Sequence, residues 1–277
     1  MKIPIFLTLL SFCLALSTAS AQNNIKDDQL APYTGTLTGE QLLQKIKDTY
    51  LALTTFKAKV QVITQAENDL VGFSSHTDID MSMMKPNYYI INWQALSARW
   101  QTAGVVWDDG SKSYLYEYNY NAYQIMTIDH QRALYDASAN LGGPPITVPS
   151  LFLQGFKQEL HVFVHPKIIG MQAINGEVCY VLDEYSGHER LWVSASRFLI
   201  MVYREYFILG PPNTLSGLAK INPKMLSSHG YTAQIFTDIS MPPLKPEDFR
   251  FKLPAGARQK VYDSEAGSNL KITGGRS

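Results

Sequence analysis

Two histidines four residues apart form the strongest metal-binding pattern in this sequence. His161 and His165 stand in the segment HVFVH, and Glu159 is close by. On a helix or a strand this spacing places both imidazoles on one side, where they could hold zinc for a hydrolase. The sequence has no His-Glu-x-x-His motif and no evident third ligand. A pair of surface histidines before Pro166 is the more common arrangement, so we predict no metal site.

Other residues with catalytic potential have simpler structural roles. Cys179 stands among Val178, Tyr180 and other apolar residues, which indicates a buried and inert thiol on a strand. Asp108 and Asp109 are adjacent and would point to opposite faces of a strand, so a turn explains them better. No Gly-x-Ser-x-Gly pentapeptide or glycine-rich phosphate loop is present. We therefore expect a protein without catalytic residues or cofactors.

The N-terminus has the pattern of a secretory signal peptide. Met1 and Lys2 begin a short positive region, and the apolar segment that ends at Leu16 is too short to span a bilayer. The sequence Ala19-Ser20-Ala21 matches the small-x-small cleavage pattern. We predict export with cleavage after residue 21, and no other stretch approaches the length of a transmembrane helix.

Composition narrows the remaining function classes. The 277-residue chain is 45% hydrophobic and 17% charged, which is enough apolar material for a sizeable core. Its formal net charge is zero, so nucleic acid is not an expected partner. We predict four parts: a signal peptide at 1–21, a flexible arm at 22–37, one domain at 38–262 and a polar tail at 263–277.

The domain is predicted to open with one amphipathic helix and to continue with many strands. Thr38 and Gln41 form a capping-box pattern before a helix from Glu40 to Thr54. Alternation then predicts strands, and two helical segments, Asp129–Ala139 and Ser150–Leu160, interrupt them. The strands are expected at 56–66, 78–84, 88–93, 105–107, 162–164, 170–173, 178–185, 189–193, 199–207 and 231–239. This order predicts an α+β fold, with helices packed against one side of a large curved antiparallel sheet.

A hairpin at Asp109-Gly110 lies at the centre of the predicted sheet. Asp-Gly between alternating apolar runs is a strong hairpin signal. Tyr114, Tyr116, Tyr118 and Tyr120 follow at every second position, which places the four rings on one face of a strand. Leu115 then faces the other way. The tyrosine row could line the concave side or form a half-wet outer face, because four hydroxyls need polar partners when buried.

The concave side of such a sheet is predicted to be apolar. It could form an ordinary filled core, which is the commoner outcome for an apolar stripe, or a cavity for a ligand. For the cavity alternative we predict eight lining residues from the two helices and the central strands. They are Leu43, Ile46, Tyr50, Trp93, Leu115, Leu151, Phe152 and Phe156.

Five motifs, taken in chain order, resemble the periplasmic LolA/LolB-like lipoprotein-carrier superfamily. They are LLQKIKDTYLALTTFKAKV, MKPNYYIINW, WDDGSKSYLYEYN, RLWVSASRFLIMVY and PEDFRFKLPAGARQKV. The resemblance covers Glu40 to about Val261 and is closer to uncharacterised members than to the lipoprotein carrier itself. It implies an incomplete β-barrel with helices in its concave side, a hydrophobic cavity for acyl chains, and a periplasmic location.

These observations favour a non-catalytic periplasmic protein that carries or senses a lipid or an acylated, lipoprotein cargo. The first alternative is an envelope scaffold with a filled core, whose contact with a partner protein would be the loop from Leu209 to Gly230. A less favoured alternative is a zinc hydrolase that uses His161 and His165.

Overall fold

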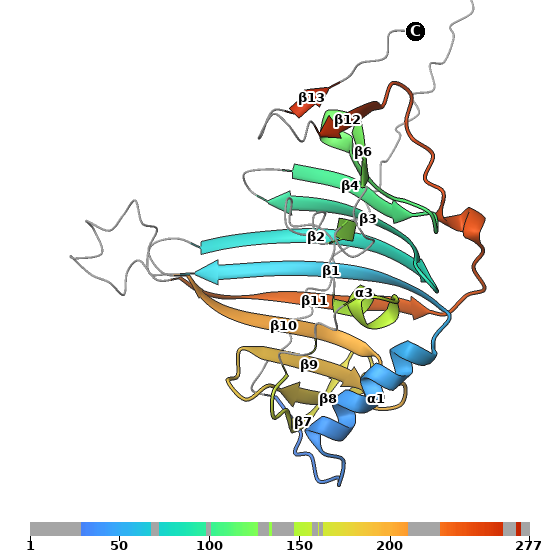
Figure 1. Cartoon of the computed structure of the whole chain (residues 1–277). Helices are drawn as coiled ribbons and strands as arrows, with labels where there is room; N and C mark the ends of the chain where they lie inside the picture. The colour runs from blue at the N-terminus through green and yellow to red at the C-terminus, as the bar shows by residue number, and fades with distance from the viewer. Residues whose placement is uncertain are drawn as a thin grey trace, which may run out of the picture.

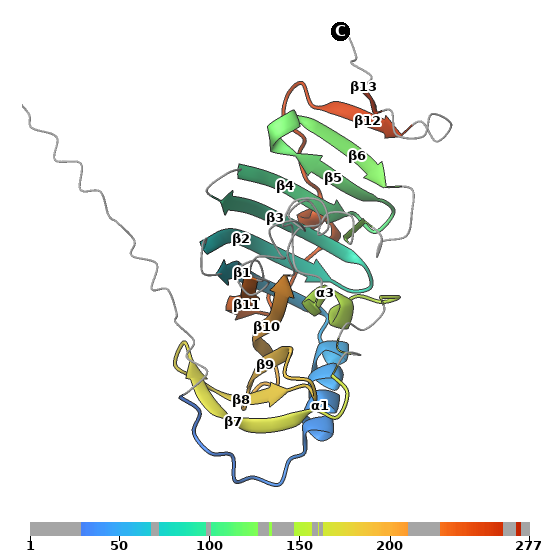
Figure 2. The same ribbon diagram turned by 90° about the vertical axis from the view of Figure 1, so that its left-hand side faces the viewer.

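The computed structural model describes residues 29–67, 72–97, 101–126, 133–134, 147–156, 160, 163–209, 228–262 and 270–272. In this part of the chain, one continuous curved sheet carries two named α-helices on the same side (Figures 1 and 2). The helices are α1 (Gly39–Ala52) and α3 (Thr147–Phe152). No helix in the described ranges is long and apolar enough to cross a membrane.

Thirteen strands of the described chain form this sheet in the order β13-β12-β6-β5-β4-β3-β2-β1-β11-β10-β9-β8-β7. Every neighbouring pair is antiparallel except β12 and β6, which are parallel. The strands β7 and β13 lie at opposite ends of the order, so the curved sheet is not closed. The predicted α+β class and the incomplete barrel are confirmed.

The strands have the following bounds. They are β1 (Thr55–Glu67), β2 (Gly72–Met84), β3 (Tyr88–Ser97), β4 (Gln101–Asp108), β5 (Ser113–Glu117), β6 (Ala122–Met126), β7 (Lys167–Ile174), β8 (Glu177–Asp183), β9 (Glu189–Ser194), β10 (Ile200–Leu209), β11 (Ser228–Ser240), β12 (Arg258–Tyr262) and β13 (Leu270–Ile272). Two short 3-10 turns, η1 (Tyr118–Tyr120) and η5 (Pro246–Phe249), complete the named elements.

Local sequence signals explain where α1 begins. The Thr38 hydroxyl accepts a hydrogen bond from the Gln41 backbone N–H, and the Gln41 side chain accepts one from the Thr38 N–H. This reciprocal pair satisfies two backbone donors that a helix start would otherwise leave open. The predicted capping box and helix are thus confirmed.

The inner face of the sheet and the two helices share one apolar cluster, which we call the inner cluster. Its fully buried members include Ile46 of α1, Phe56 of β1, Met81 of β2 and Phe152 of α3. Phe56, Ala58 and Val60 of β1 all belong to it, as the period of two requires for one face of a strand. The helices therefore lie on the concave face because that face is apolar.

The tyrosine row follows this geometry only in part. Tyr114 and Tyr116 pack on the outer face with Trp107, whereas Leu115 belongs to the inner cluster. Tyr118 and Tyr120 are in the 3-10 turn η1, so the expectation of four rings on one strand was wrong. Strand β5 ends at Glu117, and Asn121 adopts the left-handed backbone conformation that turns the chain into β6.

Two other local predictions need correction. The second central helix, α3, begins at Thr147 and ends at Phe152, not at Leu160, and Pro149 stands in its first turn. Val164, expected on a strand, is outside any strand. The Asp129–Ala139 helix lies outside the described residues except for Ala133 and Leu134, which are helical and buried.

Segments near both ends of the described chain contact the sheet. The backbone of Ala31 pairs with that of Met171 on edge strand β7 through two hydrogen bonds of 2.8 Å. Near the other end, Phe251 and Leu253 pack against Trp107 and Tyr116. Phe251 and Leu253 cover apolar side chains on the outer face, and Leu30, next to Ala31, packs against Trp192 and its neighbours. The signal peptide lies outside the described residues, and the four-part division of the chain stays a prediction.

Candidate functional site

The structure brings all eight predicted lining residues to the inner cluster. Leu43, Ile46 and Tyr50 come from α1, and Leu151 and Phe152 from α3. Trp93 and Leu115 come from β3 and β5, and Phe156 is partly buried against the cluster. These side chains pack tightly together, so the structure establishes their proximity. Their contact with a cargo stays a prediction.

Tyr50 and Lys85 join α1 to the sheet through polar contacts inside this apolar region. The Tyr50 hydroxyl accepts a hydrogen bond of 3.1 Å from the Ile200 backbone N–H of β10. Burial raises the pKa of Tyr50 well above its usual value, so the phenol stays neutral. The fully buried hydroxyl therefore satisfies a backbone donor, which would otherwise cost free energy.

Lys85, in the turn between β2 and β3, binds the C-terminal end of α1. Its Nζ donates a 3.1 Å hydrogen bond to the Tyr50 carbonyl and a further bond to the Leu51 carbonyl. The same amine lies 5.2 Å from the centroid of the Phe152 ring. The last turn of α1 has no basic residue of its own, so Lys85 supplies the positive charge that a helix C-terminus favours. Burial lowers the pKa of Lys85.

Trp93 contributes a buried polar atom to the inner cluster. The side chain is 3% exposed, and its Nε1 has no hydrogen-bond partner among the described residues. The ring packs against Gly104 of β4, where a Cβ would come within 2.3 Å of it. Glycine is therefore required at this point so that the indole can lie flat on the sheet.

Cys179 and Asp109, which were considered as possible catalytic residues, have structural roles. Cys179 is fully buried, and burial, together with the Glu177 charge, raises the pKa of its thiol to about 12. A thiol of this kind is a poor nucleophile. Partial burial by itself would raise the pKa of Asp109, but hydrogen bonds from the Ser111 hydroxyl and from the Ser111 and Lys112 backbone N–H groups outweigh it and lower the pKa. Asp109 holds the β4–β5 turn.

The zinc alternative gains no support from the described residues. His165 is exposed and adopts a left-handed backbone conformation, while His161 and Glu159 lie outside the described residues. Within the ranges that the structure describes, no group of three histidine, cysteine, aspartate or glutamate side chains could hold a metal ion. We propose no metal chemistry for this protein.

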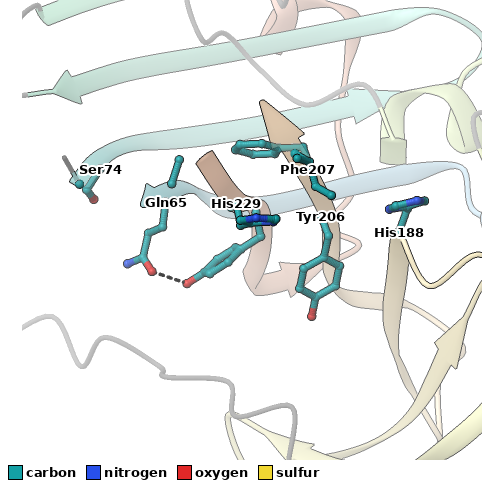
Figure 3. A pocket seen from close by; sticks show the side chains of 11 residues that line it. Gln65, Ser74, His188, Tyr206, Phe207 and His229 are labelled. Atoms are coloured by element: carbon teal, nitrogen blue, oxygen red, sulfur yellow. Dashed lines mark hydrogen bonds between the residues drawn. The ribbon is translucent and has the colours of Figure 1, made fainter. Parts of the chain in front are cut away.

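A pocket of about 600 Å³ opens where strands β1, β2, β10 and β11 meet (Figure 3). Its described lining includes Gln65, Ser74, His188, Tyr206 and Tyr231. Gln65 pairs with Ser74 on one side and with Tyr231 on the other, and Tyr231 pairs with Tyr206. Directly paired residues share a face, so this row crosses four strands. Arg204, on the same face as Tyr206, lies close to Trp192 of an outer-face cluster. The row therefore belongs to the outer face.

Sequence reasoning missed this pocket. Its residues come from segments more than 160 positions apart, such as Gln65 and Tyr231. Each strand alone shows only isolated polar and aromatic residues at alternate positions, and that pattern is common on solvated sheet faces. The register of β1 against β11 brings them together, and no local signal could have predicted it.

No protein-family model and no curated protein matches the chain. Solved structures similar to it include a LolA superfamily protein from Nitrosomonas europaea, at 12% identity and a TM-score of 0.30, covering 78% of this chain and 99% of that one. This is the superfamily that the sequence motifs resemble. LprF from Mycobacterium bovis is similar at 12% identity and a TM-score of 0.38, with 79% and 97% of the chains covered. The Pseudomonas aeruginosa MucA/MucB complex contains a chain with 11% identity and a TM-score of 0.36, covering 82% and 71%.

Proposed function

We propose that the protein is an exported, non-catalytic binding protein that carries or senses a lipid or an acylated protein in the periplasm. The observation that supports this proposal is the continuous apolar inner face, which the described chain covers with two helices instead of a second sheet. A cargo would occupy this face by replacing helix side chains.

The free energy gained by burying a cargo is similar in size to the free energy lost when the helix is displaced. Burying one methylene group contributes about 0.8 kcal/mol. The burial of one acyl chain could therefore compensate for the apolar burial that is lost when α1 leaves the sheet. Leu42, Leu43, Ile46 and Tyr50 are the apolar residues that α1 buries. The state in which α1 covers the inner face and the state in which cargo covers it would then differ little in free energy. Binding of cargo would shift the population from the first state to the second.

The two polar contacts of α1 would set the balance between these states. Displacement of the helix breaks the bond between Tyr50 and Ile200 and the bonds from Lys85 to the helix end. Each is a contact of one side chain with the backbone, which water can replace when the helix moves away. These contacts therefore position α1 on the sheet but do not prevent its displacement.

The test combines detection of bound cargo with a variant that weakens the contact between Lys85 and the end of α1. Native mass spectrometry and lipid extraction of protein purified from the periplasm should detect bound lipid, and purified protein should take up a fluorescent fatty acid. Lys85→Met keeps the aliphatic stem but removes the charge at the helix end. We expect uptake about fivefold faster in this variant, which corresponds to a loss of about 1 kcal/mol from the free energy that holds α1 on the sheet.

The control is Lys57→Met, which makes the same change at an exposed position of β1. Its uptake rate should equal that of the unmodified protein. Absence of bound lipid together with absence of uptake in all three proteins would overturn the carrier proposal.

That outcome would favour the second candidate, an envelope scaffold with a filled core. The burial of the predicted lining residues in one packed cluster is the observation that supports it. The loop proposed to contact a partner, Leu209 to Gly230, lies outside the described residues except at its ends. Deleting residues 212–226 should abolish co-purification of a partner if the scaffold proposal is correct, and unchanged co-purification would contradict it.

A further inference from the structure

The outer-face pocket has the size and surroundings of a small-molecule site separate from the inner face. Its volume of about 600 Å³ falls within the roughly 300–1,000 Å³ typical of ligand pockets. Ile208 supplies apolar surface on this face, and Tyr206 and Tyr231 supply aromatic rings. No acidic side chain is part of its described lining.

The floor of the pocket depends on a close approach of two strands. Gly230 of β11 lies beside Gln65 and Ala66 of β1, and a Cβ at Gly230 would come within 2.2 Å of the Gln65 carbonyl oxygen. Any larger residue would push the strands apart. The glycine therefore allows β1 and β11 to pair closely beneath the pocket.

A hydrogen bond from Tyr231 fixes the orientation of the Gln65 side-chain amide. The Tyr231 hydroxyl donates a 2.8 Å hydrogen bond to Gln65 Oε1, the dashed line in Figure 3. An amide whose oxygen accepts this bond keeps its NH₂ group as a donor. Gln65 and Tyr206 project into the same opening, so a ligand with an acceptor oxygen could reach both (Figure 3).

A permanent positive charge lies behind the aromatic wall. The Arg204 guanidinium is 4.7 Å from the Tyr231 ring centroid and 5.8 Å from that of Tyr206, and its Nη1 donates to the Tyr206 hydroxyl at 3.2 Å. Arg204 is 5% exposed, so solvent screens its charge weakly. His188 and His229 stand at the opening. This arrangement favours an anion over a cation.

We propose that this pocket binds a small amphipathic carboxylate, with its apolar body against the tyrosine rings and Ile208 and its carboxylate at the Gln65 amide. The site is on the face of the sheet opposite to α1 and α3, so it is independent of the cargo proposed for the inner face. The ligand is a second molecule and needs no displacement of either helix.

The experiment measures binding of phenylpropanoate to the full mature protein by isothermal titration calorimetry. Gln65→Ala should weaken binding about tenfold, because a hydrogen bond to a charged group is lost. Tyr231→Phe should weaken it less, since it removes only the hydroxyl that orients Gln65. Ser74→Trp, at an exposed position of the lining, should abolish binding by filling the pocket.

Gln61→Ala is the matched control, since Gln61 lies on the same face of the same strand four residues away. Its affinity should equal that of the unmodified protein. The methyl ester of the ligand and phenylpropylamine should both bind at least tenfold more weakly than the acid. The proposal is overturned if the acid does not bind at millimolar concentration, if the ester binds as well as the acid, or if Ser74→Trp leaves binding intact. Thermal melts of each variant establish that it is folded.

Discussion

The two faces of the sheet use aromatic residues in opposite ways. On the inner face, Tyr50, Phe56 and Phe152 form a chain of rings with centroids 5.8 and 6.2 Å apart, and all three are fully buried. On the outer face, Tyr206 and Tyr231 are half-buried beside an open pocket, with Arg204 between them and Trp192. Aromatic content alone therefore indicates neither a core nor a binding site. Packing on both sides of the ring decides between them.

The outer face itself is divided into a closed and an open part. Around Cys179 and Trp192 it is covered, and Leu30 packs there. At the ends of β1, β2, β10 and β11 it is open. The comparison between filled and open regions predicts how strongly substitutions in each will affect stability.

The largest expected effect is the removal of an inner ring. Phe152→Ala should lower the free energy of unfolding by about 3–5 kcal/mol, because it leaves a cavity among fully buried side chains. Ile208→Ala, also a truncation to alanine but in the pocket lining on the outer face, should cost about 1 kcal/mol or less, since that side chain is 62% exposed. Urea unfolding of both variants measures the difference. Equal losses would break the distinction between the two regions.

A smaller effect is expected for the polar contact inside the inner cluster. Tyr50→Phe removes the hydroxyl that accepts from the Ile200 N–H and leaves that buried donor unsatisfied. The expected loss is about 1–3 kcal/mol in urea unfolding. Tyr114→Phe is the control on the outer face, where the hydroxyl makes only a 3.4 Å contact with Asp109. A loss from Tyr50→Phe no greater than that from the control would show that α1 is not held by this bond.

The smallest expected effect concerns the closed part of the outer face. Glu177 pairs with Arg197 and accepts from Ser194, and the Arg197 hydrogen bond, partly opposed by burial, lowers the pKa of this carboxyl. A lowered folded-state pKa stabilises the protein above the unfolded-state value, and this contribution is lost as the pH falls through the folded-state value.

Glu177→Gln should therefore cost about 1 kcal/mol near neutral pH. The difference from the unmodified protein should shrink below about pH 4, near the usual glutamate pKa. Thermal or urea unfolding across this pH range measures it. A difference that is constant with pH would show that the ion pair contributes nothing and that only packing was changed.

Much of the local structure was predictable from short-range patterns. The Thr38 capping box, the Asp109-Gly110 hairpin and the period-two strands act through residues close in sequence, so local physics is enough to identify them. The bounds of α3 were predicted less well, because a short apolar run with prolines is compatible with several structures. The tyrosine row was misread where a 3-10 turn replaced the end of the strand.

The candidate sites differ in the same respect. All eight predicted inner residues were chosen for their apolar character at helical or strand spacing, which groups residues on one face of an element but does not decide which face of β5 turns inward. It could not distinguish a packed core from a ligand cavity, because both need the same apolar residues. The outer pocket had no sequence signal, since its residues are ordinary on each separate strand.

The sequence by itself determined the helix, the strands, the alternation of their faces and therefore an α+β fold with an apolar inner surface. These properties depend on capping, turn residues and hydrophobic periodicity within short stretches of the chain. Only the tertiary structure decided that Leu115 faces inward and the neighbouring tyrosines outward, and that Gln65, Tyr206 and Tyr231 share a pocket. Those outcomes depend on strand order, register and curvature, which arise from contacts between residues distant in the chain.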